Sequence, residues 1–339
     1  MGIFGSMINK SISSKDIIQL LGQSCAKGSV SLFLGAGVSK HFGLPDFSSL
    51  IEMMFWKNKN HPEIQKLNLK FNYYLTKTGK EEDYIPFETL NDAGNIESLP
   101  SLLKNKVFDG ENSDFIQLVS ECLYEDSNVD IKSRLSHFTL LGISSLIIAS
   151  NRKASFPVFT LNFDDLLEIY LGYSGFISQS IYEEGQLSTH ADVAVYHPHG
   201  LLPMNKAKKK SKNIVIGAND FSKLNSDKES FWFSAAVSVM ATNLSVYIGL
   251  SGVDATLRHM MQDAYKMKNR NPYVVKNTPA GLFFTTKNSP LKNETLINDL
   301  AEYGVMVFFV DNYETHLPEI LLASCKEATR IKEQFYDTV

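Results

Sequence analysis

The stretch Ser31–Pro45, SLFLGAGVSKHFGLP, decides the fold of this chain, because an apolar run suited to a buried strand ends abruptly in Gly-Ala-Gly. Glycine permits positive φ and lets the backbone come close to a ligand. A helix that starts just after Gly35 and Gly37 would aim free N–H groups at an anion. The stretch therefore predicts a strand followed by a phosphate-binding turn, and the alternative is a tight strand-to-helix turn without a ligand.

The same stretch disfavours hydride transfer. The dinucleotide-binding fingerprint of dehydrogenases has a third glycine three positions after the second, and this chain has Lys40 there.

Three later segments also place polar or small residues at or just after apolar runs. They are Thr160–Asp164 (TLNFD), His197–Gly200 (HPHG) and Gly249–Ser251 (GLS). Ligands of an open parallel sheet gather outside the carboxyl ends of its strands. We therefore expect these segments to meet the Gly-Ala-Gly turn at one edge of the sheet.

Together with the G-A-G-x-S turn and Gly43-Leu44-Pro45, these segments resemble the sirtuin (silent information regulator) superfamily, from about Ser31 to Asp254. The resemblance implies that NAD is the substrate, with its pyrophosphate at the turn and its nicotinamide end directed to Asn162 and Asp164. The catalytic residues that it implies are His199, as a base towards a ribose hydroxyl or water, and Asn162, which positions that water or hydroxyl. The NAD-binding residues that it implies are Gly35, Ala36, Gly37, Ser39, Pro45, Thr160, Asn162, Asp164, Gly249 and Ser251.

His197 lies two residues before His199, and Pro198 between them favours a turn, so that the two rings need not reach the same ligand. We choose His199 because it directly precedes Gly200, as the family pattern requires. Whether His197 contributes stays open.

The three cysteines, Cys25, Cys122 and Cys325, lie far apart, and the chain has no Cys-x-x-Cys pair. A structural zinc site of the paired-cysteine type is therefore excluded, and we expect no metal. In this respect the chain departs from the protein-deacetylating sirtuins and resembles the zinc-free sirtuin-like domains of bacterial anti-phage systems.

The order of apolar runs and helical patterns predicts an α/β fold, namely a doubly wound, mostly parallel, Rossmann-like sheet with a helical insertion. We expect a nucleotide-binding domain over residues 14–339 and the insertion over about residues 50–148, as a lid or an interaction surface. A first helix is expected from Ser13 or Ser14 to near Gly28, another from an N-cap at Asp254, and a last one through Leu317–Ile331. The predicted strands are Val30–Leu34, Pro157–Leu161, Val193–Tyr196, Ile214–Ile216, Val246–Leu250, Gly281–Phe284 and Val305–Val310.

The formal net charge of −4 gives no reason to expect direct nucleic-acid binding. The run Lys206–Lys212 (KAKKKSK) contains five lysines and is interpreted as a solvated loop. The sequence has no apolar run long enough to span a membrane and no secretion signal pattern, so we expect a cytoplasmic protein without a membrane partner.

Three functions stay open at this point. The first is an NAD glycohydrolase that transfers ADP-ribose to water, as an anti-phage effector acting by NAD depletion. The second is a protein deacylase or ADP-ribosyltransferase, and the third is a non-catalytic sensor of NAD or ADP-ribose. We expect control by assembly, either as a homo-oligomer or with a partner such as a HerA-type ATPase or an Argonaute-like protein, by analogy.

Overall fold

The computed structural model describes residues 13–67, 72–75, 81–84, 96–125, 138–150, 156–188, 190–221, 231–251, 254–270 and 278–336. Within these residues seven strands form one sheet in the order β5-β6-β4-β1-β7-β8-β9, and every neighbouring pair is parallel. The strands are β1 (Val30–Leu34), β4 (Phe156–Thr160), β5 (Ser178–Ile181), β6 (Val193–Tyr196), β7 (Leu244–Ile248), β8 (Gly281–Thr286) and β9 (Val305–Val310). The doubly wound, Rossmann-like fold is thereby confirmed.

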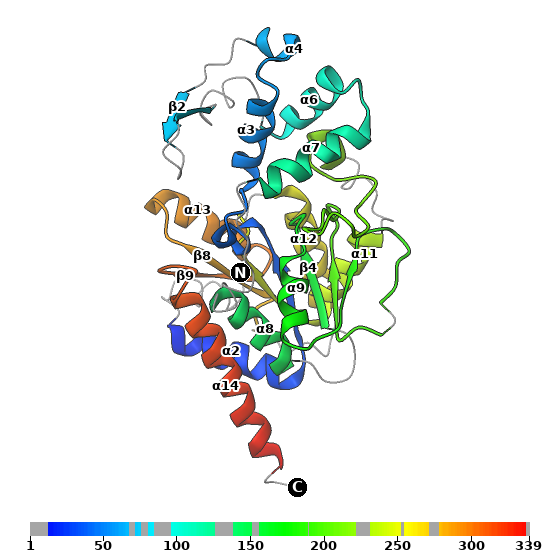
Figure 1. Ribbon diagram of the computed structural model, residues 1–339. Helices are drawn as coiled ribbons and strands as arrows, with labels where there is room; N and C mark the ends of the chain where they lie inside the picture. Colours follow the sequence, from blue (N-terminus) through cyan, green and yellow to red (C-terminus); the bar gives the residue numbers. More distant parts are fainter. Residues whose placement is uncertain are drawn as a thin grey trace.

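Helices cover both faces of this sheet (Figure 1). The helices on one face are α2 (Ser14–Lys27), α8 (Phe138–Ser150), α9 (Leu166–Tyr173) and α14 (His316–Tyr336). Those on the other face are α11 (Phe231–Thr242), α12 (Ala255–Arg270) and α13 (Pro290–Ala301). The long α14 packs against α2 and α8, so the last helix folds back onto its own domain.

Local sequence signals fix two of the helix starts. Ser13 and Asp16 form a capping box at the start of α2, and Gly28 ends that helix with a φ of 66°. Leu257 N donates to Asp254 Oδ1 over 2.8 Å, which confirms Asp254 as the predicted cap of α12.

One predicted strand is wrong, and one strand of the seven-stranded sheet was missed, as was the hairpin of β2 (Asn72–Leu75) and β3 (Glu81–Tyr84). Ile214–Ile216 lies in a loop, where Val215 N donates to the His199 carbonyl over 2.9 Å. Both isoleucines are buried, so their apolar pattern reflects burial and not strand pairing. The strand that completes the sheet is β5, an edge strand whose sequence SQSI lacks an apolar run.

A row of aromatic rings crosses the face that carries α11 and α12. Tyr196, Phe159, Phe33, Tyr247 and Phe283 come from five neighbouring strands, and adjacent rings stack with centroids 4.7–6.1 Å apart. The strand register aligns these residues as direct partners. Stacked aromatic pairs contribute more stability than the apolar area that they bury, so this row stabilises the centre of the sheet.

The described part of the chain between β1 and β4 is mostly helical. Its elements before α8 are α3 (Phe47–Lys57), α4 (Pro62–Gln65), the antiparallel hairpin β2 (Asn72–Leu75) and β3 (Glu81–Tyr84), α6 (Leu99–Val107) and α7 (Asn112–Tyr124). Figure 1 shows α3, α4, α6 and α7 gathered above the sheet, whereas α8 returns to it. The boundaries of the insertion and of the 14–339 domain stay predictions. No helix in the described ranges is long and apolar enough to cross a membrane.

Candidate functional site

The glycine turn after β1 packs directly on the loop after β7. Gly35 N donates to Ile248 O over 2.9 Å, and Gly37 N donates to Gly249 O over 3.0 Å. A Cβ on Gly35 would lie 2.5 Å from Gly249 O, and one on Gly37 would lie 2.7 Å from Gly249 Cα. These glycines are therefore required because two loops meet backbone to backbone where the strand order reverses, which is the place where such sheets bind ligands.

The conformation of this turn differs from the expectation. Gly35 has a φ of −130° and Gly37 also lies outside the positive-φ region, whereas Gly249 in the facing loop has a positive φ, of 74°. The chain continues as two short 3-10 turns, Ala36–Val38 and Lys40–Phe42, and α3 begins only at Phe47. Val38 N and Ser39 N donate to carbonyls within the first turn, so these N–H groups do not form the anion-binding helix start that we expected.

We predict that Gly249→Ala destabilises the protein by about 2–4 kcal/mol, because its Cβ would need a left-handed backbone and would displace its neighbours. That Cβ would lie 2.7 Å from Val38 N. The free energy of unfolding in urea measures the effect. Gly172→Ala is the matched control, since a Cβ there meets nothing within 4 Å. Equal stability of the two variants would contradict the role given to the loop contact.

Asn162 ties the end of β4 to the glycine turn. Its Nδ2 donates to Gly35 O over 3.1 Å and to Ser39 Oγ over 3.0 Å, and its backbone N donates to Thr160 Oγ1 over 3.2 Å. The side chain is half-buried, and no described residue donates to its Oδ1. The amide is therefore fixed in orientation, and its carbonyl oxygen keeps an acceptor free.

Asp164 is buried two residues further on. Burial raises the pKa of this carboxyl group to about 6, although a hydrogen bond with Ser39 and one from Leu166 N lower it. The bond from Leu166 N, at 3.2 Å, caps the start of α9. Asp164 thus serves as a helix cap and also places a carboxylate beside Asn162 that titrates close to neutral pH.

The neighbouring Asp165 has a different role, because it lies beneath the loop after His199. Asp165 Oδ1 accepts from Met204 N over 2.9 Å, and Oδ2 pairs with Lys208 Nζ over 2.9 Å.

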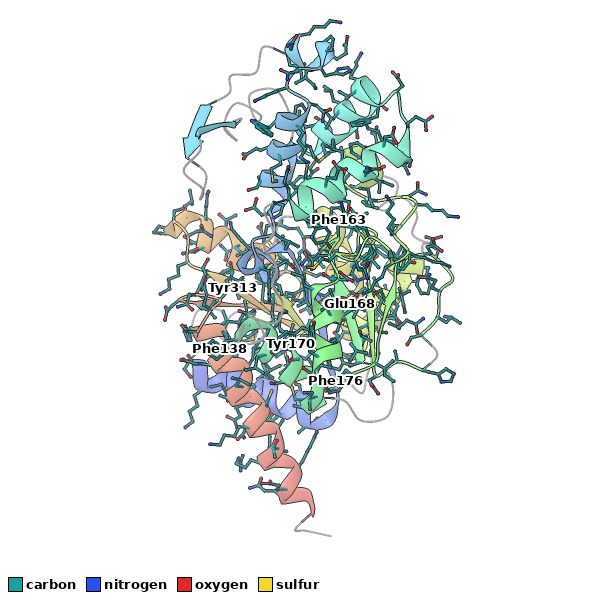
Figure 2. All side chains as sticks on the ribbon, in the orientation of Figure 1. Phe138, Phe163, Glu168, Tyr170, Phe176 and Tyr313 are labelled. Atoms are coloured by element: carbon teal, nitrogen blue, oxygen red, sulfur yellow. The ribbon has the colours of Figure 1, made fainter. Side chains whose placement is uncertain are left out.

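His197 and Glu168 form a buried pair that sequence reasoning missed. His197 Nε2 lies 2.8 Å from Glu168 Oε1, and Nδ1 lies 3.2 Å from the backbone oxygen of Asn162. Both partners accept hydrogen bonds, so both ring nitrogens donate. Although burial alone would lower it, the Glu168 carboxylate raises the pKa of His197 above its ordinary value. Glu168 is buried, and Figure 2 labels Phe163 above it in the view, towards the insertion helices.

His199 lies apart from this pair, in a small cavity on the face of the aromatic row. The cavity has a volume of about 20 Å³, and its lining includes Phe33, Phe159, His199 and Asp254. Burial lowers the pKa of His199, and Asp254 opposes the shift only in part. A neutral imidazole at physiological pH is the form that can accept a proton.

The structure brings most of the predicted residues to one edge of the sheet. Gly35, Gly37, Ser39, Thr160, Asn162, Asp164 and Gly249 form one contact network, and Ala36 lies within its first turn. No hydrogen bond in the described ranges ties Pro45 or the exposed Ser251 to this network. The described residues also contain no group of three or more His, Cys, Asp or Glu side chains placed to hold a metal.

A Rossmann-like sheet with polar residues at the carboxyl ends of its strands is an arrangement in which ligands commonly bind at that edge. Residues 157–308 match the family model of the SIR2-like domain. The matched region starts in β4 and includes Asn162, Asp164, His199 and Gly249. This match supports the sirtuin-like superfamily and suggests NAD-dependent activity in general.

A solved structure described as "Structural Basis for the Mechanism and Regulation of Sir2 Enzymes" is similar to this chain. Its sequence identity is 13%, its TM-score is 0.43, and the similarity covers 94% of this chain and 99% of that chain. No curated protein matches the sequence.

Proposed function

We propose that the protein is an NAD glycohydrolase, with water as the acceptor and nicotinamide and ADP-ribose as the products. The observation that carries the proposal is the position of His199, whose neutral imidazole lines a cavity of about 20 Å³ at the carboxyl ends of the strands. A cavity of this size has room for about one water molecule.

In the proposed reaction the bond between the ribose C1′ and the nicotinamide nitrogen breaks, and nicotinamide leaves as a neutral molecule. Water adds its oxygen to C1′, and His199 accepts the proton that the water loses. Positive charge develops on the ribose during bond cleavage, so acceptor groups stabilise the transition state. Asn162 supplies its amide oxygen for this purpose, and Asp164, as a carboxylate above its pKa of about 6, accepts from the carboxamide.

We predict that His199→Ala lowers the rate of nicotinamide release by at least about two orders of magnitude, the usual scale for a general base. The rate is measured per folded protein, with the fold verified by circular dichroism. His259→Ala, at an exposed position on α12, is the matched control and keeps the wild-type rate. If His197→Ala is the more damaging change per folded molecule, the base has been assigned to the wrong histidine.

One assay distinguishes the hydrolase from the two other candidate functions, a deacylase or transferase and a non-catalytic sensor. Nicotinamide is measured after incubation of the purified chain with NAD, with and without an acylated peptide. Release without peptide supports the hydrolase, release only with peptide indicates a deacylase or transferase, and saturable NAD binding without release indicates a sensor.

On the resemblance to zinc-free sirtuin-like defence domains, we place this activity in anti-phage defence by NAD depletion. Unrestrained NAD hydrolysis would harm the host cell, so control by a homo-oligomer or by a partner such as a HerA-type ATPase is part of the proposal. The insertion is our candidate for the restraining element, because it follows the glycine turn directly and Figure 1 shows its helices above the sheet.

A further inference from the structure

The lysine-rich loop Lys206–Lys212 has exposed lysines, in agreement with its interpretation as a solvated loop, and hydrogen bonds give it a defined conformation. Leu201 N donates to Ser211 Oγ over 2.7 Å, and Ser211 N donates to Leu201 O over 2.9 Å, so the two ends of the loop are joined. Ser211 is only 3% exposed. Inside the loop, Lys208 N and Ala207 N both bond to Asn205. The lysines are therefore carried on a defined turn.

The insertion holds this loop from the other side. Tyr124 Oη, at the end of α7, donates to Leu202 O over 2.6 Å. Asn112, at the start of α7, donates to Asn213 Oδ1 over 2.8 Å and accepts from Lys104 over 2.7 Å. Together these bonds fix the loop to both ends of α7.

A cavity of about 430 Å³ lies between α7 and the loop. The loop contributes Lys206, Lys208, Lys209, Lys210 and Pro203, and α7 contributes Gln117, Ser120 and Glu121. Its volume lies within the range of small-molecule sites, about 300–1,000 Å³. Four lysines thus face one compact, concave site in a chain whose net charge is −4.

Most of this positive charge has no counter-charge in the structure. Lys208 pairs with Asp165 over 2.9 Å, whereas Lys206, Lys209 and Lys210 form no ion pair with any residue in the described ranges. Holding like charges together on an ordered loop is unfavourable, and a bound anion relieves the repulsion. Ammonium groups are effective point-charge partners for phosphate.

We propose that this cavity binds a small polyphosphate-bearing ligand of the nucleoside triphosphate class. The three unpaired ammonium groups would contact the phosphates, and Gln117, Ser120 and Glu121 offer donors and acceptors to the sugar and base. The concave shape and the mixed lining favour a compact ligand over a nucleic-acid backbone, which a flatter basic surface would suit. This site is distinct from the network around Asn162 and does not depend on NAD cleavage.

The test measures binding to the full chain by calorimetry, with ATP, inorganic tripolyphosphate and a single-stranded oligonucleotide as probes and NAD absent. We expect saturable binding of ATP at one site. The double variant Lys209→Ala/Lys210→Ala should weaken it by about tenfold or more, through the loss of two phosphate partners. The matched control, Lys287→Ala/Lys292→Ala, removes two exposed lysines elsewhere and should leave the affinity unchanged.

Three results would overturn the proposal. They are no saturable binding of ATP or tripolyphosphate, an equal loss of affinity in both double variants, and binding of the oligonucleotide alone. Because no step of this test requires nicotinamide release, its failure and the failure of the proposed hydrolase activity are distinguishable.

Discussion

Replacing Asn162 by alanine abolishes nicotinamide release, with an expected loss of about three orders of magnitude, the scale found when a group that stabilises transition-state charge is removed. The loss falls on the chemical step. The variant also loses the hydrogen bonds of Nδ2 to Gly35 O and Ser39 Oγ. Because a hydrogen bond contributes about 1 kcal/mol, the fold and much of the NAD affinity should remain.

Single-turnover measurement of nicotinamide release, together with NAD binding by calorimetry, separates these effects. Asn298→Ala is the matched control, since Asn298 is exposed on α13 and lies outside the site. Unchanged turnover in Asn162→Ala would refute the role of this side chain. A loss of NAD binding as large as the loss of rate would make Asn162 a ground-state binding residue instead.

Glu168→Gln should lower the free energy of unfolding by about 3 kcal/mol near pH 6, because it removes the charged partner of a buried imidazolium. The effect depends on pH. The raised pKa of His197 contributes stability that is complete below about 6.5 and is lost as pH rises through the folded pKa. The pKa of Glu168 is lowered, because the effect of His197 exceeds the opposing effect of burial. The stability that this lowered pKa contributes is lost as pH falls through the folded pKa of Glu168.

Urea unfolding between pH 5 and pH 8 measures this difference. The gap between wild type and variant should be widest at pH 5–6 and should narrow towards pH 8. Glu294→Gln, at an exposed position on α13, controls for the charge change. A constant gap across the pH range would contradict the raised pKa of His197 that we attribute to Glu168.

Much of the fold could be predicted from short apolar runs, because strands buried on both faces consist of such runs. The edge strand β5 could not, since SQSI has neither an apolar run nor a clear alternation. Ile214–Ile216 was wrongly predicted as a strand, because a buried loop segment has the same apolar pattern as a buried strand.

Part of the candidate site could also be predicted from the sequence, and part of it could not. The convergence of Asn162, Asp164 and the glycine turn followed from their positions at strand ends. Glu168 was missed because its partner His197 is distant in sequence and pairs with it only through the β4–β6 contact. A usable signal was present, since Glu168 is the only charged residue in the apolar helix LLEIYLGY. The glycines were predicted from ligand approach, whereas the structure gives loop packing as their cause.

Product analysis of the purified full chain incubated with NAD and no peptide, with Asn162→Ala in parallel, decides whether water is the acceptor. We expect nicotinamide and ADP-ribose to accumulate in equal amounts with the wild-type chain, slowly if assembly restrains it, and neither product to form with the variant. NAD that binds saturably but stays intact, or that is consumed only when an acylated peptide is added, would contradict the assignment of water as the acceptor.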